Sequence, residues 1–210
     1  MKTIHWIALI FVFIGTFSFT QEQNSQNKLN DLLQACTQDP HDTSSVKKYI
    51  GLSLSNKGDS LIAFTFVQKG IALGRDLKFK KGLADAFTMR AYLLRLHNGK
   101  LDEIESDLFK SRDHYQTLND EQGEIKIYHQ LFKLYTDFKQ TDKAIGLFEL
   151  VLKEKSDNKL YLFHMNGILG RFLKETGQFQ KATEYLSRSI LYFPEISKPS
   201  SKIPQVSSSI

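Results

Sequence analysis

The sequence predicts an all-α fold, an α-α superhelix built from about four stacked helical hairpins. A short pattern recurs at Ala63, Ile104, Ala144 and Ala182, which are 41, 40 and 38 residues apart. A repeat of this length is typical of helical solenoids, in which each unit buries its apolar face against its neighbours. With 4 Pro, 12 Gly and 1 Cys in 210 residues, a turn-rich all-β domain and a disulfide scaffold are excluded.

The amino terminus has the pattern of a secretory signal peptide over residues 1–20. Lys2 is followed by an uncharged run with an apolar stretch at residues 7–14, and the chain turns polar at Gln21. We therefore expect cleavage before Gln21 and a periplasmic or cell-envelope location. The alternative is an uncleaved segment that tethers the chain to the membrane, because the run is about the minimum length that spans a bilayer.

Residues 21–43 are predicted to form an N-terminal capping segment. Leu29, Leu32, Leu33 and Cys36 recur at helical spacing, so we expect a short helix from Asn24 to Asp39 that ends before Pro40. Cys36 would then pack as a small apolar residue rather than act as a reactive thiol.

The repeats occupy residues 44–194, and each is predicted to be two helices joined by a tight turn. A turn signal precedes each anchor, and an apolar residue follows it by four positions, on the same helix face. The turns are Gly58-Asp59, Asn98-Gly99, Lys139 to Thr141, and Gly177-Gln178, and the apolar residues are Val67, Leu108, Phe148 and Leu186.

The first helix of each pair also repeats, with small residues that would let two helices approach closely. The matched pairs are Ile50-Gly51, Ala91-Tyr92, Leu131-Phe132 and Leu169-Gly170. The second repeat has Arg95 where an apolar residue is expected, which indicates a slip of one residue.

The carboxyl end is predicted to be a disordered Ser/Pro tail or linker over residues 195–210. Pro194 would end the last helix, and the segment after it holds six Ser and two further Pro. The last helix carries Ile190, Leu191 and Phe193, so we expect a partner or a further repeat to cover it.

The fourth repeat resembles a tetratricopeptide repeat (TPR) read from end to end. Its matching residues are Asn166, Leu169, Gly170, Leu173, Gly177, Phe179, Ala182, Leu186, Ser189 and Pro194. The resemblance covers about two thirds of the chain and is weakest in the second repeat, where Ile104 replaces the usual Ala. The TPR period is 34, so the longer spacing implies longer second helices or longer turns. A HEAT-like repeat fits the period but does not require small residues at Gly170 and Ala182.

No motif for catalysis is present, and we expect neither an enzyme nor a bound cofactor. The sequence lacks a phosphate-binding glycine loop, a nucleophile elbow and a zinc-protease motif. The six His are spread one per predicted element, so none has metal-ligand spacing with another. Asp102, Glu103, Glu105 and Asp107 are interpreted as the solvated start of a helix, where negative charge is favourable.

Nucleic acid is not an expected partner. The net charge is +5, but Lys and Arg are interspersed with Asp and Glu, apart from the short run at Lys78, Lys80 and Lys81. Binding to nucleic acid requires a concentrated basic stripe.

The TPR resemblance implies that first helices line a groove for a protein or peptide partner. The groove residues it implies are Lys48, Asn56, His97, Lys126, His129, Lys133, His164, Arg171 and Lys174, with Leu52, Ser55, Met89, Leu93, Thr136, Asp137, Gly167 and Glu175 beside them. Such a groove is net basic and is similar to TPR clamps for an acidic or carboxylate-ended peptide. We therefore expect a non-catalytic binding scaffold in the cell envelope. The alternative is the sensory part of an envelope signalling protein whose kinase, cyclase or DNA-binding domain is absent from this chain.

Overall fold

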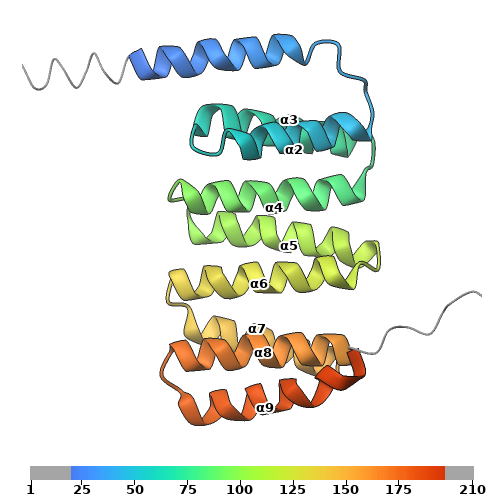
Figure 1. The fold of residues 1–210 in the computed structure, drawn as a ribbon, viewed down its shortest axis with the longest axis vertical. Helices are drawn as coiled ribbons and strands as arrows, with labels where there is room; N and C mark the ends of the chain where they lie inside the picture. The colour runs from blue at the N-terminus through green and yellow to red at the C-terminus, as the bar shows by residue number, and fades with distance from the viewer. Residues whose placement is uncertain (1–19, 197–210) are drawn as a thin grey trace, which may run out of the picture. The chain divides into compact units, whose positions relative to one another are not determined.

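A computed structural model describes residues 20–196, and in that range the chain is helical with no strand. A helix over residues 20–35 is followed by eight further helices (Figure 1). These are α2 (Thr43–Ser55), α3 (Ser60–Asp76), α4 (Lys80–Leu96), α5 (Leu101–Thr117), α6 (Glu121–Asp137), α7 (Thr141–Glu154), α8 (Lys159–Glu175) and α9 (Phe179–Ile196). The predicted signal peptide, except Thr20, and residues 197–210 of the predicted tail lie outside the described residues.

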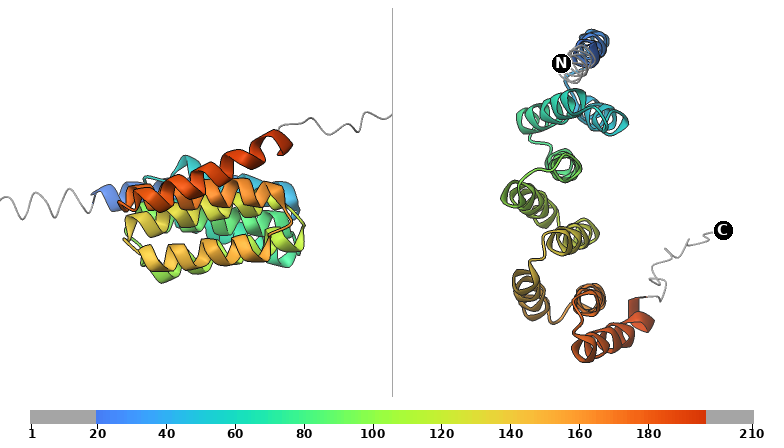
Figure 2. Two further views of the ribbon diagram at one scale, coloured as in Figure 1. Left: turned by 90° about the horizontal axis from the view of Figure 1, so that it is seen from below. Right: turned by 90° about the vertical axis from the view of Figure 1, so that its left-hand side faces the viewer.

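The chain divides into two compact units, Met1–Glu124 and Ile125–Ile210. In the first unit, helices α2 to α5 follow one another in antiparallel order. Helices α6 to α9 do the same, and all of α6 after Glu124 belongs to the second unit (Figure 1 and Figure 2). The architecture is therefore one of helical hairpins, which confirms the predicted fold class.

The four anchor residues occupy equivalent places in the second helix of each hairpin. Each of them is the fourth residue of its helix and is at most 3% exposed; they are Ala63 in α3, Ile104 in α5, Ala144 in α7 and Ala182 in α9. The backbone N–H of each anchor donates to the carbonyl of the residue just before its helix. The repeat deduced from sequence spacing is thus a structural repeat.

Five of the turns share one hydrogen-bonded geometry at the end of the preceding helix. In each, an N–H donates to the carbonyl five residues earlier: Phe79 to Gly74, Gly99 to Leu94, Asp120 to Tyr115, Gln140 to Tyr135, and Gln178 to Leu173. The residue before each donor has a positive φ; these residues are Lys78, Asn98, Asn119, Lys139 and Gly177. This is the Schellman arrangement, which satisfies carbonyls left without partners at a helix end.

The long repeat period comes from long helices. Helices α3, α4, α5, α6 and α8 each have 17 residues, whereas the turns between helices are short. The alternative of longer turns between repeats is therefore wrong. The turn of the second repeat, residues 97–100, has four residues, as does turn 56–59 of the first repeat, so turn length does not account for the predicted slip.

Two apolar clusters lie among the described residues of the first unit. Leu29 and Cys36 from the amino-terminal segment pack with Ile62 and Phe66 of α3. A second cluster joins α3 to α4; it contains Ala63, Val67, Ile71, Leu83, Ala86, Phe87 and Leu93. The first helix ends at residue 35, earlier than predicted, and a hydrogen-bonded turn leads to Pro40.

Two local predictions are wrong. Gly51 is exposed on α2, and a Cβ built there meets nothing within 4 Å, so it does not allow a close helix approach. The helix α9 continues to Ile196, two residues beyond Pro194, so the proline does not end the helix, although it has no N–H to donate to the preceding turn. Gly170, by contrast, has the predicted role, since a Cβ there would lie 2.7 Å from Cγ of Leu186 in α9.

Candidate functional site: a cluster of aromatic and cationic side chains on α6 and α8

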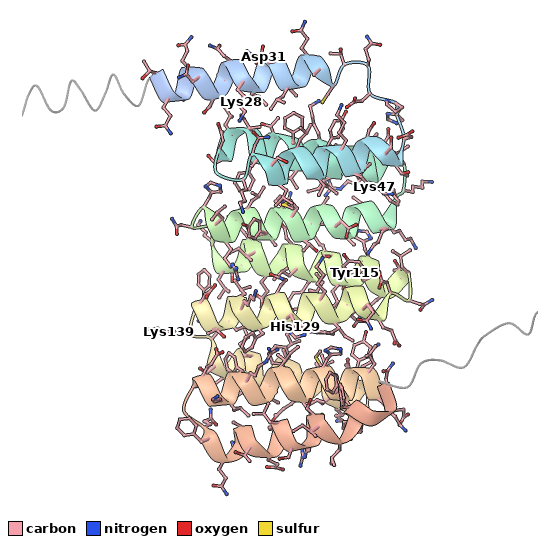
Figure 3. The ribbon with its side chains drawn as sticks, in the orientation of Figure 1. Lys28, Asp31, Lys47, Tyr115, His129 and Lys139 are labelled. Carbon is pink, nitrogen blue, oxygen red and sulfur yellow. The ribbon has the colours of Figure 1, made fainter. Side chains whose placement is uncertain are left out.

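In the second unit, α6 and α8 bring His129, His164 and Arg171 into contact (Figure 3 labels His129). Nη2 of Arg171 lies 3.3 Å from Nδ1 of His129. The rings of His129 and His164 meet edge to face, with their centroids 5.8 Å apart. Three side chains implied by the TPR resemblance are therefore adjacent in space, although His129 and His164 are 35 positions apart in the sequence.

Aromatic side chains extend this group, which we call the α6/α8 cluster: Phe132, His129, His164, Phe163 and Arg171. The guanidinium carbon of Arg171 lies 5.5 Å from the centroid of the Phe132 ring, within the range of a cation–π interaction. Phe163 contacts His164 edge to face at 4.9 Å between centroids. Arg171, although exposed, therefore has two neighbours in the cluster, His129 and Phe132.

Both histidines of the cluster favour the neutral form. Burial lowers the pKa of His129 to about 4, and the charges of Arg171, His164 and Lys133 act in the same direction. Burial and then Arg171 also lower the pKa of His164. A neutral imidazole keeps one N–H donor, so at neutral pH the cluster offers imidazole N–H groups beside a permanent cation.

Further cations of the predicted groove lie one helical turn from the cluster. Lys126 and Lys133 are three residues before and four residues after His129 on α6, and Lys174 is three residues after Arg171 on α8. All three are exposed, and this spacing places residues on one side of a helix. Asp137 and Glu175 come later, toward the helix ends. The positive charge is therefore concentrated around the cluster itself.

In the first unit, Lys48, Asn56 and His97 each have a partner within the chain. Nζ of Lys48 lies 2.6 Å from Oδ1 of Asp39, and the amide of Asn56 donates to the carbonyl of Leu52 at the end of α2. Nε2 of His97 lies 2.9 Å from the carbonyl oxygen of Lys57. Leu93, which was expected beside the groove, is fully buried, so that prediction is wrong.

The interpretation of the α5 carboxylates as a solvated helix start is wrong for two of the four. Glu105 is 8% and Asp107 1% exposed, and Asp107 accepts two hydrogen bonds from Arg90 of α4, at 2.6 and 2.5 Å. The position three after the anchor is held by Phe66 in α3, Leu147 in α7 and Tyr185 in α9. Asp107 occupies this position in α5, where the other repeats have an apolar or aromatic residue. That difference in the sequence could have indicated that Asp107 is buried with a partner.

The cluster lacks the ligands of a metal centre. Among residues 20–196, no group of three His, Cys, Asp or Glu side chains is placed to hold a metal ion. His129 and His164 would supply two metal ligands at most, and Nδ1 of His129 already accepts a hydrogen bond from Arg171.

No described helix combines the length and apolar character needed to cross a bilayer.

Comparison with known proteins identifies the fold. No protein-family model matches the chain, and no curated protein matches it. Solved structures do match: BtubC (BKLC) from P. vanneervenii has 19% identity and a TM-score of 0.57 over 90% of this chain and 78% of its own. The TPR-like repeats of a protein described as a Podosopora anserina kinesin light chain have 17% identity and a TM-score of 0.59 over 86% and 92%. A second crystal structure of those repeats, from a variant with one substitution, matches at 18% identity with a TM-score of 0.59 over 85% and 91%.

Proposed function

Because the chain has the TPR-like helical-repeat fold, we propose that it is a non-catalytic scaffold that binds a protein or peptide through the α6/α8 cluster. TPR-like repeats generally bind protein partners, and this supports the coarse function. The contact between Arg171, His129 and His164 supports the location of the site. The chemical group that it fits is an acidic side chain or a C-terminal carboxylate.

The donor set of the cluster favours an anion. Arg171 donates one hydrogen bond to His129 and keeps the other donors of its guanidinium, which matches a carboxylate in geometry and charge. The neutral imidazoles add N–H donors, and Lys133 adds long-range attraction because it is close enough to lower the pKa of His129. An incoming carboxylate would therefore meet convergent donors and a positive potential.

A binding role fits the cluster better than a catalytic one. Its members are two imidazoles, one guanidinium and two phenyl rings, with no hydroxyl, thiol or carboxylate to act as a nucleophile. Arg171 occupies the Nδ1 lone pair through which His129 would act as a base. What remains is recognition by charge, hydrogen bonds and aromatic contact.

The experiment is a calorimetric titration of the chain with an acetylated Glu-Ala-Glu-Leu peptide that ends in a free carboxylate. The variant K133E/R171E should bind at least about tenfold more weakly, about 1.4 kcal/mol. The matched control K153E/K181E makes the same charge change at exposed lysines of α7 and α9. It should bind like the wild type. Equal affinity of wild type and K133E/R171E would remove the site, and retained circular dichroism would show that both variants fold.

We also propose that the chain is exported to the cell envelope, with residues 1–20 as the signal. The support is the charge and apolar pattern of that segment. Amino-terminal sequencing of the chain from an envelope fraction should begin at Gln21. A chain found in that fraction that begins at Met1 would favour the membrane tether, and a chain confined to the cytoplasm would contradict export.

A further inference from the structure

A second candidate site lies in the first unit, where α3, α4 and α5 line an open hollow of about 550 Å³. Phe64 and Leu94, both half-buried, form the apolar wall of the hollow, and Arg90 forms its polar floor. Asp102 and Glu103 lie at its edge on the first turn of α5. This volume is within the range of about 300–1,000 Å³ that is usual for ligand pockets.

The Arg90 guanidinium at the floor of the hollow is already held by neighbouring side chains. Nε and Nη2 of Arg90 bind the two carboxylate oxygens of Asp107, whose side chain is 2% exposed. Arg90 is also stacked near the ring of Phe87, with 5.4 Å between its guanidinium carbon and the ring centroid. Its Nη1 has only a long contact, 3.4 Å, to Oε1 of Gln68. This nitrogen can therefore donate to a carbonyl that enters the hollow, at little cost in ordering.

The edge of the hollow carries two carboxylates that a cationic partner can reach. Asp102 and Glu103 are exposed, and no salt bridge is formed by either of them within the described residues, although the charge of Glu103 contributes to the raised pKa of Arg90. The other lining charges are engaged around Asp107, which Arg90 binds and which Lys110 approaches at 3.8 Å. The lining thus has three carboxylates against two cations, although the chain as a whole is net positive.

We propose that this hollow binds a lysine or arginine side chain of a partner peptide. The aliphatic stem lies against Phe64 and Leu94, as amphipathic basic side chains do on apolar surface. The cationic head reaches Asp102 and Glu103, and Arg90 donates to a carbonyl of the peptide backbone. An acidic side chain would be repelled by the same two carboxylates, so the site selects charge opposite to that selected by the α6/α8 cluster. It lies in the other unit and does not depend on that cluster.

The test uses acetyl-Ala-Lys-Leu-amide as the probe, titrated into the ¹⁵N-labelled chain and followed by amide chemical shifts. Shifts should concentrate on α3, α4 and α5 around Phe64, Leu94 and Glu103. Peptides with norleucine or glutamate in place of the lysine should bind at least about fivefold more weakly, about 1 kcal/mol. The variant D102N/E103Q keeps side-chain size and should lose the same factor for the lysine peptide.

The control D113N removes an exposed carboxylate of α5 that lies outside the hollow, and it should bind like the wild type. The variant S106W fills the hollow from an exposed position and should abolish the shifts. Equal affinities for the lysine and norleucine peptides, or lysine binding unchanged in D102N/E103Q, would overturn the proposal. So would an absence of shifts at about 10 mM peptide, since a useful single-side-chain subsite should contribute more than about 3 kcal/mol of binding.

Discussion

Arg171 donates a hydrogen bond from Nη2 to Nδ1 of His129 over 3.3 Å, which ties α8 to α6. A guanidinium has no acceptor, so His129 must accept at Nδ1 and carry its proton at Nε2. A second proton on Nδ1 would break this hydrogen bond and place an imidazolium beside a guanidinium. The arrangement therefore requires a neutral His129.

Mild acid should destabilise the chain for this reason. The folded-state pKa of His129 is lowered from 6.5 to about 4, so between these values the unfolded chain binds a proton that the folded chain does not. The free energy of unfolding should fall as the pH is lowered through this window, by at most about 3 kcal/mol. His164, whose pKa is also lowered, acts in the same direction. Urea unfolding followed by circular dichroism between about pH 7 and about pH 5 measures the slope.

The matched variant is H129Q, which keeps an acceptor near Arg171 but does not titrate. Its unfolding free energy should depend less steeply on pH over the same range. If wild type and H129Q show the same slope, His129 is not neutral in the folded chain.

Binding of the acidic peptide should respond to pH with the opposite sign. A carboxylate bound at the α6/α8 cluster would raise the pKa values of His129 and His164, so the complex takes up protons that the free chain does not. Affinity should therefore increase as the pH falls from about 7.5 to about 5.5, by about threefold or more if one imidazole becomes protonated. Calorimetry in buffers of different ionisation enthalpy should show proton uptake. A flat profile would place the carboxylate away from these histidines.

Removal of the Asp107 charge should be strongly destabilising. The variant D107N leaves the Arg90 guanidinium, 19% exposed, without its ion-pair partner, at a cost of about 2–3 kcal/mol. Replacement of both by apolar residues, R90M/D107L, should recover most of the loss because no unpaired charge remains. The control D113N removes an exposed carboxylate of α5 and should change stability by less than about 0.5 kcal/mol. If D107N and D113N are equally stable, the ion pair contributes nothing.

Ala144 and Asp107 show which features could be predicted from the sequence: positions within a hairpin could, and contacts between helices could not. Ala144 follows a turn signal within one hairpin, and that local pattern recurs in each repeat, so its place in α7 followed from spacing alone. Asp107 has its partner on another helix, 17 positions away, and nearby carboxylates favoured the solvated interpretation. The pair His129 and His164 also escaped a search for short-range ligand spacing. Contacts between helices depend on how hairpins stack, which residue periodicity does not specify.

Two glycines with the same predicted role should respond oppositely to alanine. In G170A the new Cβ would lie 2.7 Å from Cγ and 3.0 Å from the backbone nitrogen of Leu186, so α9 must move, at a cost of about 1–3 kcal/mol. In G51A nothing lies within 4 Å, and alanine restricts the unfolded chain and favours helix, a gain of about 0.5–1 kcal/mol. Chemical denaturation of both variants compares the two directly. A loss of stability in G51A would show that α2 has a close neighbour at that position.

The positive φ residues in the turns allow the last prediction. Lys139 has φ 54° and Gly177 has φ 82°, in turns where Gln140 and Gln178 make the same hydrogen bond to the carbonyl five residues earlier. A side chain with a Cβ is strained in this region, whereas glycine is not. K139G should therefore raise the free energy of unfolding by about 0.5–1 kcal/mol, and G177A should lower it by about 1 kcal/mol. The control K133G places a glycine in the middle of α6 at a solvent-exposed position, where no positive φ is needed. It should lower the free energy of unfolding by about 1 kcal/mol. If K139G is destabilising to the same extent as K133G, the turn after α6 does not have a left-handed residue in solution.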